Sequence, residues 1–327
     1  MNHHAIWAEF MPYRWIEGDL ARLAHYGLQL NLAIHIGRLP DPDLERLLKA
    51  ACEHQVPIGA WLLLEDQDGY WPNANNAELY HQACLRFLEY MDQANLRVAE
   101  LIVDMETPLA LSRLLKGQIM KGLQLEWRRW QSPENRVLFE AAVIHYQQLL
   151  ASAHQAGLSV QVVTYPFLVH DALAGNTAFQ EFLQVPVTPI EWDRISLMVY
   201  RSSFQDLSPL PLSSWLVGHY LQQAQSCLKQ PVSGALGVIG SIGKISEGGF
   251  RDVDEIRADI GAAKAAGVES IQLFSLDGMH QLGAPDDWLR LYQTPALSCK
   301  ALPGDHVLLQ TLQQSHGLLS RLNQSNK

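Results

Sequence analysis

The chain has 327 residues, a length that fits either about two average domains or one large α/β barrel. Hydrophobic residues make up 48% of it and charged residues only 18%, a composition that excludes a wholly disordered chain. The 34 acidic residues outnumber the 24 basic ones, and the resulting formal net charge of −10 argues against nucleic acid as a main partner.

The four cysteines, Cys52, Cys84, Cys227 and Cys299, are scattered and form no C-x-x-C pair. This spacing indicates neither a disulfide framework nor a structural zinc site. The N-terminus lacks the basic and apolar regions of a leader, and no segment holds about 20 consecutive apolar residues. We therefore expect a cytoplasmic protein with no membrane partner.

Short apolar runs alternate with helical patterns along the whole chain. The eight runs are rich in Val, Ile and Leu, as buried parallel strands are, and cover residues 5–10, 28–36, 57–64, 98–106, 158–165, 194–200, 234–240 and 268–274. Apolar residues spaced by three and four predict helices between them, for example over 43–52, 77–93, 135–156 and 253–266. A stop signal precedes several strands, at Gly27, Asn95, Gly157 and Gly267.

This repeated order predicts a parallel α/β fold, and eight such units predict a single (β/α)₈ barrel. A doubly wound open sheet is the alternative, but no Gly-x-Gly-x-x-Gly motif follows the first strand. We expect one domain over 1–327, with the barrel over about 5–284 and a helical extension over about 285–327. Insertions over 65–76 and 107–134, the second carrying Trp127 and Trp130, follow the third and fourth strands. Both belong to the end of a barrel where active sites form.

The fourth strand ends in two carboxylates, Asp104 and Glu106. Because side chains alternate along a strand, both are expected to point into the barrel mouth with Cα atoms about 6.5–7 Å apart. Two like charges at this distance push their pKa values apart, and an acid beside a carboxylate suits acid–base work on a glycosidic bond. The structural alternative is a solvated strand end whose acids pair with loop cations.

The sixth strand ends in Tyr200, which is followed by Arg201. The Tyr200 hydroxyl is expected to face the mouth, where it can donate to a substrate oxygen, although a rim aromatic can equally serve only for packing. Arg201 is a candidate partner for an acid in the same pocket.

These two strand ends, Asp104-Met105-Glu106 and Met198-Val199-Tyr200, resemble the chitinase-like family 18 glycoside hydrolases. That family has a (β/α)₈ barrel with D-x-x-D-x-D-x-E on the fourth strand and M-x-Y-D on the sixth. The resemblance implies that Glu106 is the general acid, that Asp104 orients it or the substrate, and that Tyr200 steadies the reacting sugar. The family's remaining motif aspartates fall on Ala99, Ile102 and Arg201 here.

Other polar and aromatic residues are expected around the same mouth. Such a set suits a carbohydrate, whose hydroxyl groups need acids and amides and whose ring faces need flat apolar partners. The substrate-binding candidates are Trp7, Glu9, Glu65, Asp66, Trp71, Tyr165, Arg201 and Gln272. Further candidates for the mouth are Asn31, His35, Trp61, Asp68, Tyr70, Thr164, His170, Asp171 and Asp277.

We thus predict a glycoside hydrolase that acts on an oligosaccharide or glycoconjugate without a cofactor or metal. One alternative is a metal-dependent sugar isomerase or lyase, whose ligands would come from Glu9, His35, Glu65, Asp104, Glu106, His170 and Asp277. No H-x-H or H-x-x-x-H spacing marks such a site. Another alternative is a carbohydrate-binding barrel without catalysis, because most of the aspartate motif is missing.

Overall fold

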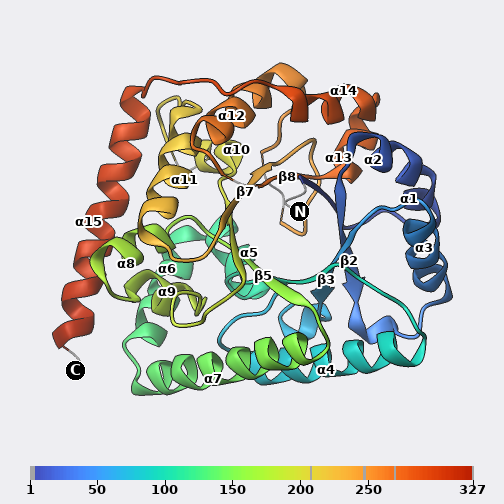
Figure 1. The fold of residues 1–327 in the computed structure, drawn as a ribbon. Coiled ribbons are helices and arrows are strands. Elements are labelled where there is room, and N and C mark those ends of the chain that lie inside the picture. The colour runs from blue at the N-terminus through green and yellow to red at the C-terminus, as the bar shows by residue number, and fades with distance from the viewer. Residues whose placement is uncertain (1–3, 207, 246–247, 269, 326–327) are drawn as a thin grey trace.

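Eight parallel strands close into a barrel in the order in which they occur in the chain (Figure 1). The structure is a computed structural model, and it describes residues 4–206, 208–245, 248–268 and 270–325. The last strand pairs with the first through Ala5 opposite Gln272 and Ile6 opposite Leu273. The predicted (β/α)₈ barrel is therefore confirmed. The strands are β1 Ala5–Ala8, β2 Gln29–His35, β3 Ile58–Leu63, β4 Glu100–Asp104, β5 Ser159–Thr164, β6 Arg194–Met198, β7 Val232–Gly237 and β8 Ser270–Phe274.

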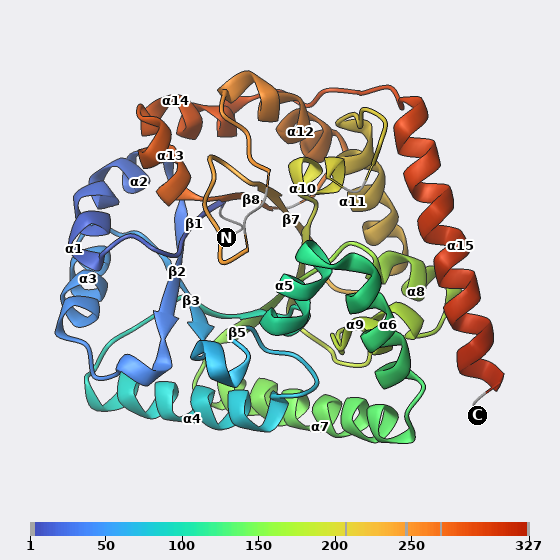
Figure 2. The ribbon, with the colours of Figure 1, turned by 180° about the vertical axis from the view of Figure 1, so that it is seen from behind.

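Helices surround the barrel and connect its strands, as both views show (Figures 1 and 2). The α-helices are α1 Tyr13–Ile16, α2 Leu20–Tyr26, α3 Pro42–Glu53, α4 Ala77–Gln93, α5 Leu109–Gly117, α6 Ile119–Trp130, α7 Pro133–Gln155, α8 Leu168–Ala174, α9 Ala178–Leu183, α10 Arg201–Gln205, α11 Trp215–Cys227, α12 Val253–Ala265, α13 Leu276–Leu282, α14 Pro285–Leu289 and α15 Pro303–Ser325. The 3-10 helices are η1 Glu17–Asp19, η2 Ile36–Arg38, η3 Asp66–Asp68 and η4 Arg290–Gln293. No helix in the described part of the chain is long and apolar enough to cross a membrane.

The predicted helix stops occur where the sequence places them. Gly27, Asn95, Gly157 and Gly267 have φ angles of 64°, 50°, 78° and 79°, in the left-handed region. This conformation ends a helix, and glycine and asparagine adopt it most readily. Each stop therefore turns the chain from a helix into the strand that follows.

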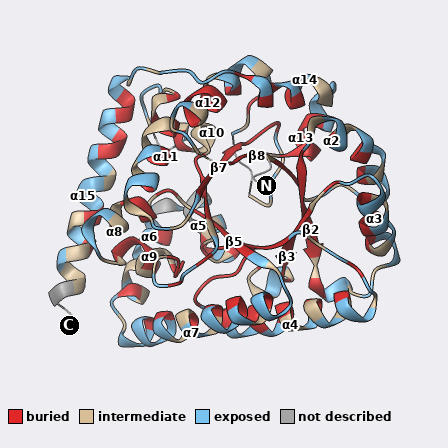
Figure 3. Ribbon diagram, viewed as in Figure 1, coloured by how far each residue is buried: buried red, intermediate tan, exposed pale blue. Residues whose placement is uncertain are grey.

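Alternation along each strand gives the barrel two different faces. On β2, Leu30, Leu32 and Ile34 belong to the large apolar cluster shared with the surrounding helices. Residues two apart on the other face, such as Asn31 and Ala33, point into the barrel. Figure 3 shows that the strands are buried almost throughout, whereas the helices are exposed on their outer sides.

Towards the N-terminal ends of the strands, the barrel interior contains a layer of polar side chains. The Gln272 amide donates to Gln161 over 2.7 Å and accepts from Asn31 over 3.3 Å. At the N-terminal ends of β2, β4 and β6, Gln29 donates to Glu100, which also lies 3.5 Å from Arg194. Gln272 was expected at the mouth as a substrate-binding residue, but it lies in this network because β8 continues to Phe274.

The two insertions and the C-terminal extension have different roles. Residues 65–76 form η3 and an asparagine-rich loop, whereas residues 107–134 contain helices α5 and α6. Trp130 of α6 packs with Phe179 and Leu319, away from the mouth where its insertion was expected to place it. Helix α15 packs against α8 and α9, where buried Asp171 lies 2.9 Å from His316 (Figure 1).

Several strands end earlier than the apolar pattern predicted. The first was expected to reach Phe10 but ends at Ala8, because the next three backbone N–H groups bind Asp277 instead of a strand. The fourth was expected to include Glu106 but ends at Asp104, and the Glu106 N–H donates to the Pro72 carbonyl oxygen over 3.2 Å. Both ends therefore turn out of the sheet at the mouth.

Candidate functional site

Aromatic side chains line the C-terminal end of the barrel interior. Trp7 and Trp61 meet edge to face with ring centroids 5.0 Å apart, and Phe274 lies 6.3 Å from Trp61. Tyr200 stacks on Phe274 at 6.1 Å. We call this set, completed by Tyr70, Trp71 and Tyr165, the mouth cluster. It brings together aromatic residues from strands that are far apart in the chain.

Asp104 lies beside this cluster at the end of β4 and is only 4% exposed. Burial raises its pKa to about 8, and the nearby Trp61 indole N–H opposes this effect. The geometry does not complete a hydrogen bond, however, so Asp104 Oδ1, Trp61 Nε1 and Trp7 Nε1 are buried without a partner among the described residues. Unpaired buried polar atoms are rare in proteins, and water or a ligand is one way in which they are satisfied.

Glu9 follows β1 and is half-buried at the same mouth. The Tyr70 hydroxyl donates to its Oε1 over 2.6 Å. Burial raises the Glu9 pKa to about 8; the Tyr70 hydrogen bond lowers it, whereas the charges of Asp277 and Asp104 raise it. The strand pattern did not predict that the charge of Asp104 acts on Glu9.

Glu106 occupies a different position at the rim. It is half-buried, and its Oε2 accepts a hydrogen bond from the Tyr165 hydroxyl over 3.0 Å. The same hydroxyl accepts from the Thr107 backbone N–H over 3.3 Å. Tyr165 directly follows Thr164, the last residue of β5, and β5 pairs with β4. Tyr165 thus lies at the mouth beside the segment that follows β4. Tyr165 therefore orients Glu106.

Lys244, which sequence reasoning missed, covers part of the mouth. Its Nζ lies 2.7 Å from Asp66 Oδ1 and 4.4 Å from the centre of the Tyr70 ring. The hydrogen bond from Lys244 is the main cause that lowers the pKa of Asp66. The segment after β7 was expected to continue as a strand to Gly240, and it instead forms the loop that crosses the end of the barrel in Figure 2. A lone lysine in a glycine-rich loop gave no signal of its own.

The remaining predicted site residues divide between the mouth and the outer layers. Trp71 is buried against Tyr70 with ring centroids 5.1 Å apart, and Glu65 lies close to Gly37 after β2. Arg201 is directed to α12, where it donates to Asp259 over 2.7 Å and to the Glu255 carbonyl oxygen over 2.7 Å. The expected pairing of Arg201 with an acid of the mouth is therefore wrong, because α10 begins at Arg201 and turns outward from the barrel.

The acids and histidines of the metal alternative do not form one donor set. His170 lies 3.2 Å from the Tyr220 hydroxyl between α8 and α11, and Asp277 accepts three backbone N–H groups. Within the described ranges, no three His, Cys, Asp or Glu side chains gather closely enough to hold a metal ion. The residues do not fit a metal centre of the isomerase type, and we derive no step through one.

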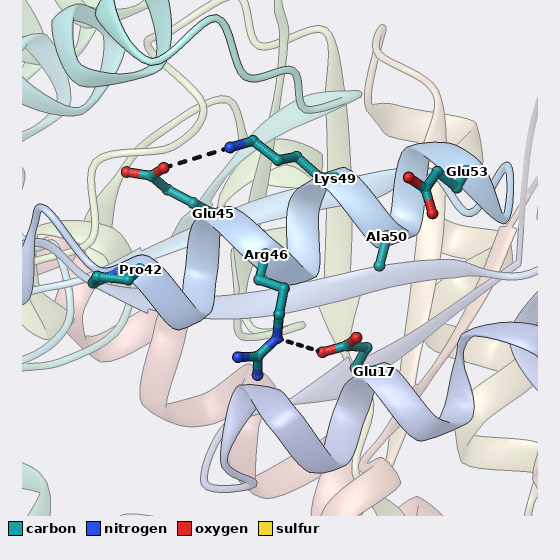
Figure 4. A pocket seen from close by; sticks show the side chains of 7 residues that line it. All are labelled: Glu17, Pro42, Glu45, Arg46, Lys49, Ala50 and Glu53. Carbon is teal, nitrogen blue, oxygen red and sulfur yellow. Dashed lines mark hydrogen bonds and ion pairs between the residues drawn. The ribbon is translucent and has the colours of Figure 1, made fainter.

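A surface pocket of about 360 Å³ lies between η1 and α3, outside the barrel (Figure 4). Its two cations are paired, Arg46 with Glu17 at 2.8 Å and Lys49 with Glu45 at 3.6 Å, and Glu53 is an exposed acid. The pocket offers no unpaired group comparable to those of the mouth cluster. We therefore place the candidate site at the mouth.

Comparison with known proteins establishes the class of fold. No protein-family model matches the sequence, and no curated protein matches it. Among solved structures, the chain is similar to beta-glycosidase BGL167, with 13% identity, a TM-score of 0.50 and coverage of 88% of each chain. At this identity the likeness shows a common barrel and nothing about the reaction.

Two further similar structures belong to sugar-processing enzymes by their names. One is beta-glucosidase 1317, with 14% identity, a TM-score of 0.48 and coverage of 80% of this chain and 77% of the other. The other is D-allulose 3-epimerase from Methylomonas sp., with 11% identity, a TM-score of 0.47 and coverage of 89% and 95%.

Proposed function

We propose that this protein is a carbohydrate-acting enzyme that hydrolyses a glycosidic bond at the barrel mouth. The observation that carries the proposal is the combination of acids and aromatic rings at one end of the barrel. Asp104 is the last residue of β4 and Glu106 follows two residues later; Trp61 lies beside Asp104, and Tyr165 of the mouth cluster contacts Glu106. Flat rings suit the faces of sugars, and the unpaired indole N–H groups of both tryptophans suit hydroxyl oxygens.

In the proposed reaction, Glu106 donates its proton to the oxygen of the leaving group as the glycosidic bond breaks. The Tyr165 hydroxyl holds the Glu106 carboxyl group in place through the hydrogen bond of 3.0 Å. Asp104 or a substrate group stabilises the positive charge that develops on the sugar ring. A water molecule then adds to that carbon, and its proton returns to the Glu106 carboxylate.

The resemblance to the chitinase-like family 18 glycoside hydrolases supports these roles at three positions. Glu106, Asp104 and Tyr200 match the family's strand-end motifs, and Tyr200 lies in the mouth cluster. Ala99, Ile102 and Arg201 replace its other aspartates. The proposal therefore covers hydrolysis of a glycosidic bond and leaves the N-acetyl-hexosamine preference of the family aside.

The carbohydrate-binding barrel without catalysis is the second candidate. The observation that favours it is the cover over the mouth, where Lys244 contacts both Asp66 and Tyr70. These contacts join the loop after β7 to the 65–76 segment at the mouth. This function predicts sugar binding with no turnover.

The test compares the wild type with Glu106→Gln on a panel of aryl glycosides that release a coloured phenol. We expect the variant to lose hydrolysis by at least about 100-fold, in keeping with the loss of a general acid, and to keep its thermal stability. Thr107→Ser, a neighbouring conservative change, is the matched control and should retain activity. Equal turnover by the wild type and Glu106→Gln would contradict the assignment.

A further inference from the structure

Asp171 is a fully buried acid of α8 that lies away from the mouth, where the sequence had suggested a place for it. Its carboxylate accepts hydrogen bonds from three groups at the start of α9. These donors are the Phe179 N–H over 2.9 Å, the Gln180 N–H over 2.9 Å and the Gln180 side-chain amide over 3.0 Å. Asp171 therefore fixes the start of α9 against α8.

The C-terminal helix α15, which runs beside α8 and α9 on the outside of the barrel, supplies a further partner of Asp171 (Figure 1). Nε2 of buried His316 lies 2.9 Å from Asp171 Oδ1 and 3.2 Å from Asn176 Oδ1. Both neighbours are oxygen acceptors, so this nitrogen of His316 carries the proton. One buried contact thus joins three helices from distant parts of the chain.

A row of aromatic rings leads from His316 to the mouth. The ring centroids of His316 and Phe179 lie 5.2 Å apart, and those of Phe179 and Phe167 lie 6.1 Å apart. Phe167 stacks on Tyr165 at 6.1 Å with an angle of 23° between the rings. Rings at these distances are in the range of direct aromatic pairs. The last ring of the row carries the hydroxyl that donates to Glu106 over 3.0 Å.

Helix α9 makes a second connection to the same acid. It ends at Leu183, whose carbonyl oxygen accepts a hydrogen bond from the Thr107 hydroxyl over 3.2 Å. Thr107 directly follows Glu106, and its backbone N–H donates to the Tyr165 hydroxyl over 3.3 Å. The helix that Asp171 fixes at its start therefore holds, at its end, the segment that carries Glu106.

We propose that Asp171 and His316 are positioning residues of the mouth, which hold Glu106 in place through α9 and through the aromatic row. Both residues act through others, so α15 supports the site from outside the barrel. The importance of this support for catalysis rests on the proposed function, because that function makes Glu106 the general acid. The link between α15 and Tyr165 is a property of the protein alone, and the two claims can fail separately.

The first experiment follows the Tyr165 hydroxyl by NMR without any substrate. Protein labelled with ¹³C at tyrosine Cζ gives a signal for each tyrosine, and the signal that Tyr165→Phe lacks belongs to Tyr165. The Cζ shift depends on the hydrogen bonds of the hydroxyl. In His316→Ala, Asp171 keeps its three donors from α9, so we expect a folded protein. Its Tyr165 signal should move to lower ppm, because the hydroxyl donates a weaker hydrogen bond to Glu106.

Two variants of α15 serve as controls. His316→Gln keeps a side-chain N–H that can reach Asp171 and should restore the wild-type shift. Ser315→Ala changes the exposed neighbour of His316 and should leave the shift unchanged. A wild-type Tyr165 signal in folded His316→Ala would overturn the proposal. If that variant does not fold, Leu319→Ala loosens the packing of α15 on Phe179, and an unchanged Tyr165 signal there would also overturn it.

The second experiment measures hydrolysis of the aryl glycosides. His316→Ala should lower kcat by about 10-fold with little change in KM, because a misplaced acid slows the chemical step. The losses in His316→Ala and Tyr165→Phe should be less than additive in the double variant, since both act on the same carboxyl group. Strictly additive losses would contradict the positioning role. A wild type without hydrolysis would refute the proposed function and leave the NMR signals to decide the link between α15 and Tyr165.

Discussion

The Tyr165 hydroxyl and Glu106 Oε2 lie 3.0 Å apart and join the end of β5 to the segment after β4. This hydrogen bond fixes the carboxyl group that we assign as the general acid. Tyr165→Phe keeps the ring and removes the donor, so we expect kcat/KM on aryl glycosides to fall by about 10-fold to 100-fold, the range for a hydrogen bond to a charged group. Tyr90→Phe is the matched control, since Tyr90 donates to Glu45 over 3.1 Å on the outer surface. Equal losses in both variants would contradict the role of Tyr165.

Arg201 should contribute to stability and not to sugar binding. Its guanidinium group pairs with Asp259, whose side chain is only 2% exposed. Arg201→Met leaves this carboxylate unpaired, and we expect a loss of about 3–5 kcal/mol in the free energy of unfolding by urea. The double variant Arg201→Met/Asp259→Leu should recover much of that loss. A stable Arg201→Met protein that has lost sugar binding would show that the residue serves the mouth.

Gln272 should behave as an interior residue. Gln272→Leu removes the hydrogen bonds that the Gln161 and Asn31 amides make with Gln272, and we expect a loss of about 1–3 kcal/mol in stability, measured by urea unfolding. Gln93→Leu alters an amide on the exposed end of α4 and should cost much less. Wild-type stability together with weaker sugar binding in Gln272→Leu would show that Gln272 binds substrate at the mouth.

Lys244 should influence the protonation of the mouth. Its positive charge lowers the pKa of Glu9, so Lys244→Met should move the loss of the Glu9 proton to higher pH. The expected result is an upward shift in the midpoint of the tryptophan fluorescence titration, because Trp7 and Trp61 lie in the mouth cluster. Lys49→Met removes a surface cation on α3 and should leave the midpoint unchanged. A downward shift in Lys244→Met would contradict this electrostatic role.

The fold was more predictable than the site because the local patterns that define it are strong. Apolar strand runs and left-handed stops such as Gly27 and Gly157 lie within a few residues of each other and define each βα unit. The site depends on where strands end, and the apolar pattern did not reveal that Glu106 lies beyond β4. Contacts between distant segments, such as Tyr70 with Glu9, depend on loop conformations that no local pattern encodes.

Residue type alone also could not separate a mouth residue from an interior or outer one. Arg201 and Gln272 have the chemistry of substrate-binding residues, but their partners are Asp259 and Gln161. In each case the side chain forms a hydrogen bond with a buried polar residue in another part of the fold. Lys244 was not predicted as a mouth residue, because its contact with Tyr70 forms only when the loop after β7 crosses the end of the barrel.

The layer of amides inside the barrel also determines how the strands align. On β2, Gln29 and Asn31 point inward and bind other amides, whereas Leu30 and Leu32 point outward into the apolar cluster. A shift of one residue between strands would turn leucines into the polar layer and amides towards the helices. Misaligned barrels are therefore penalised on both faces at once. The hydrogen bonds of Gln272 with Gln161 and Asn31 therefore favour the alignment in which β8 closes the barrel against β1.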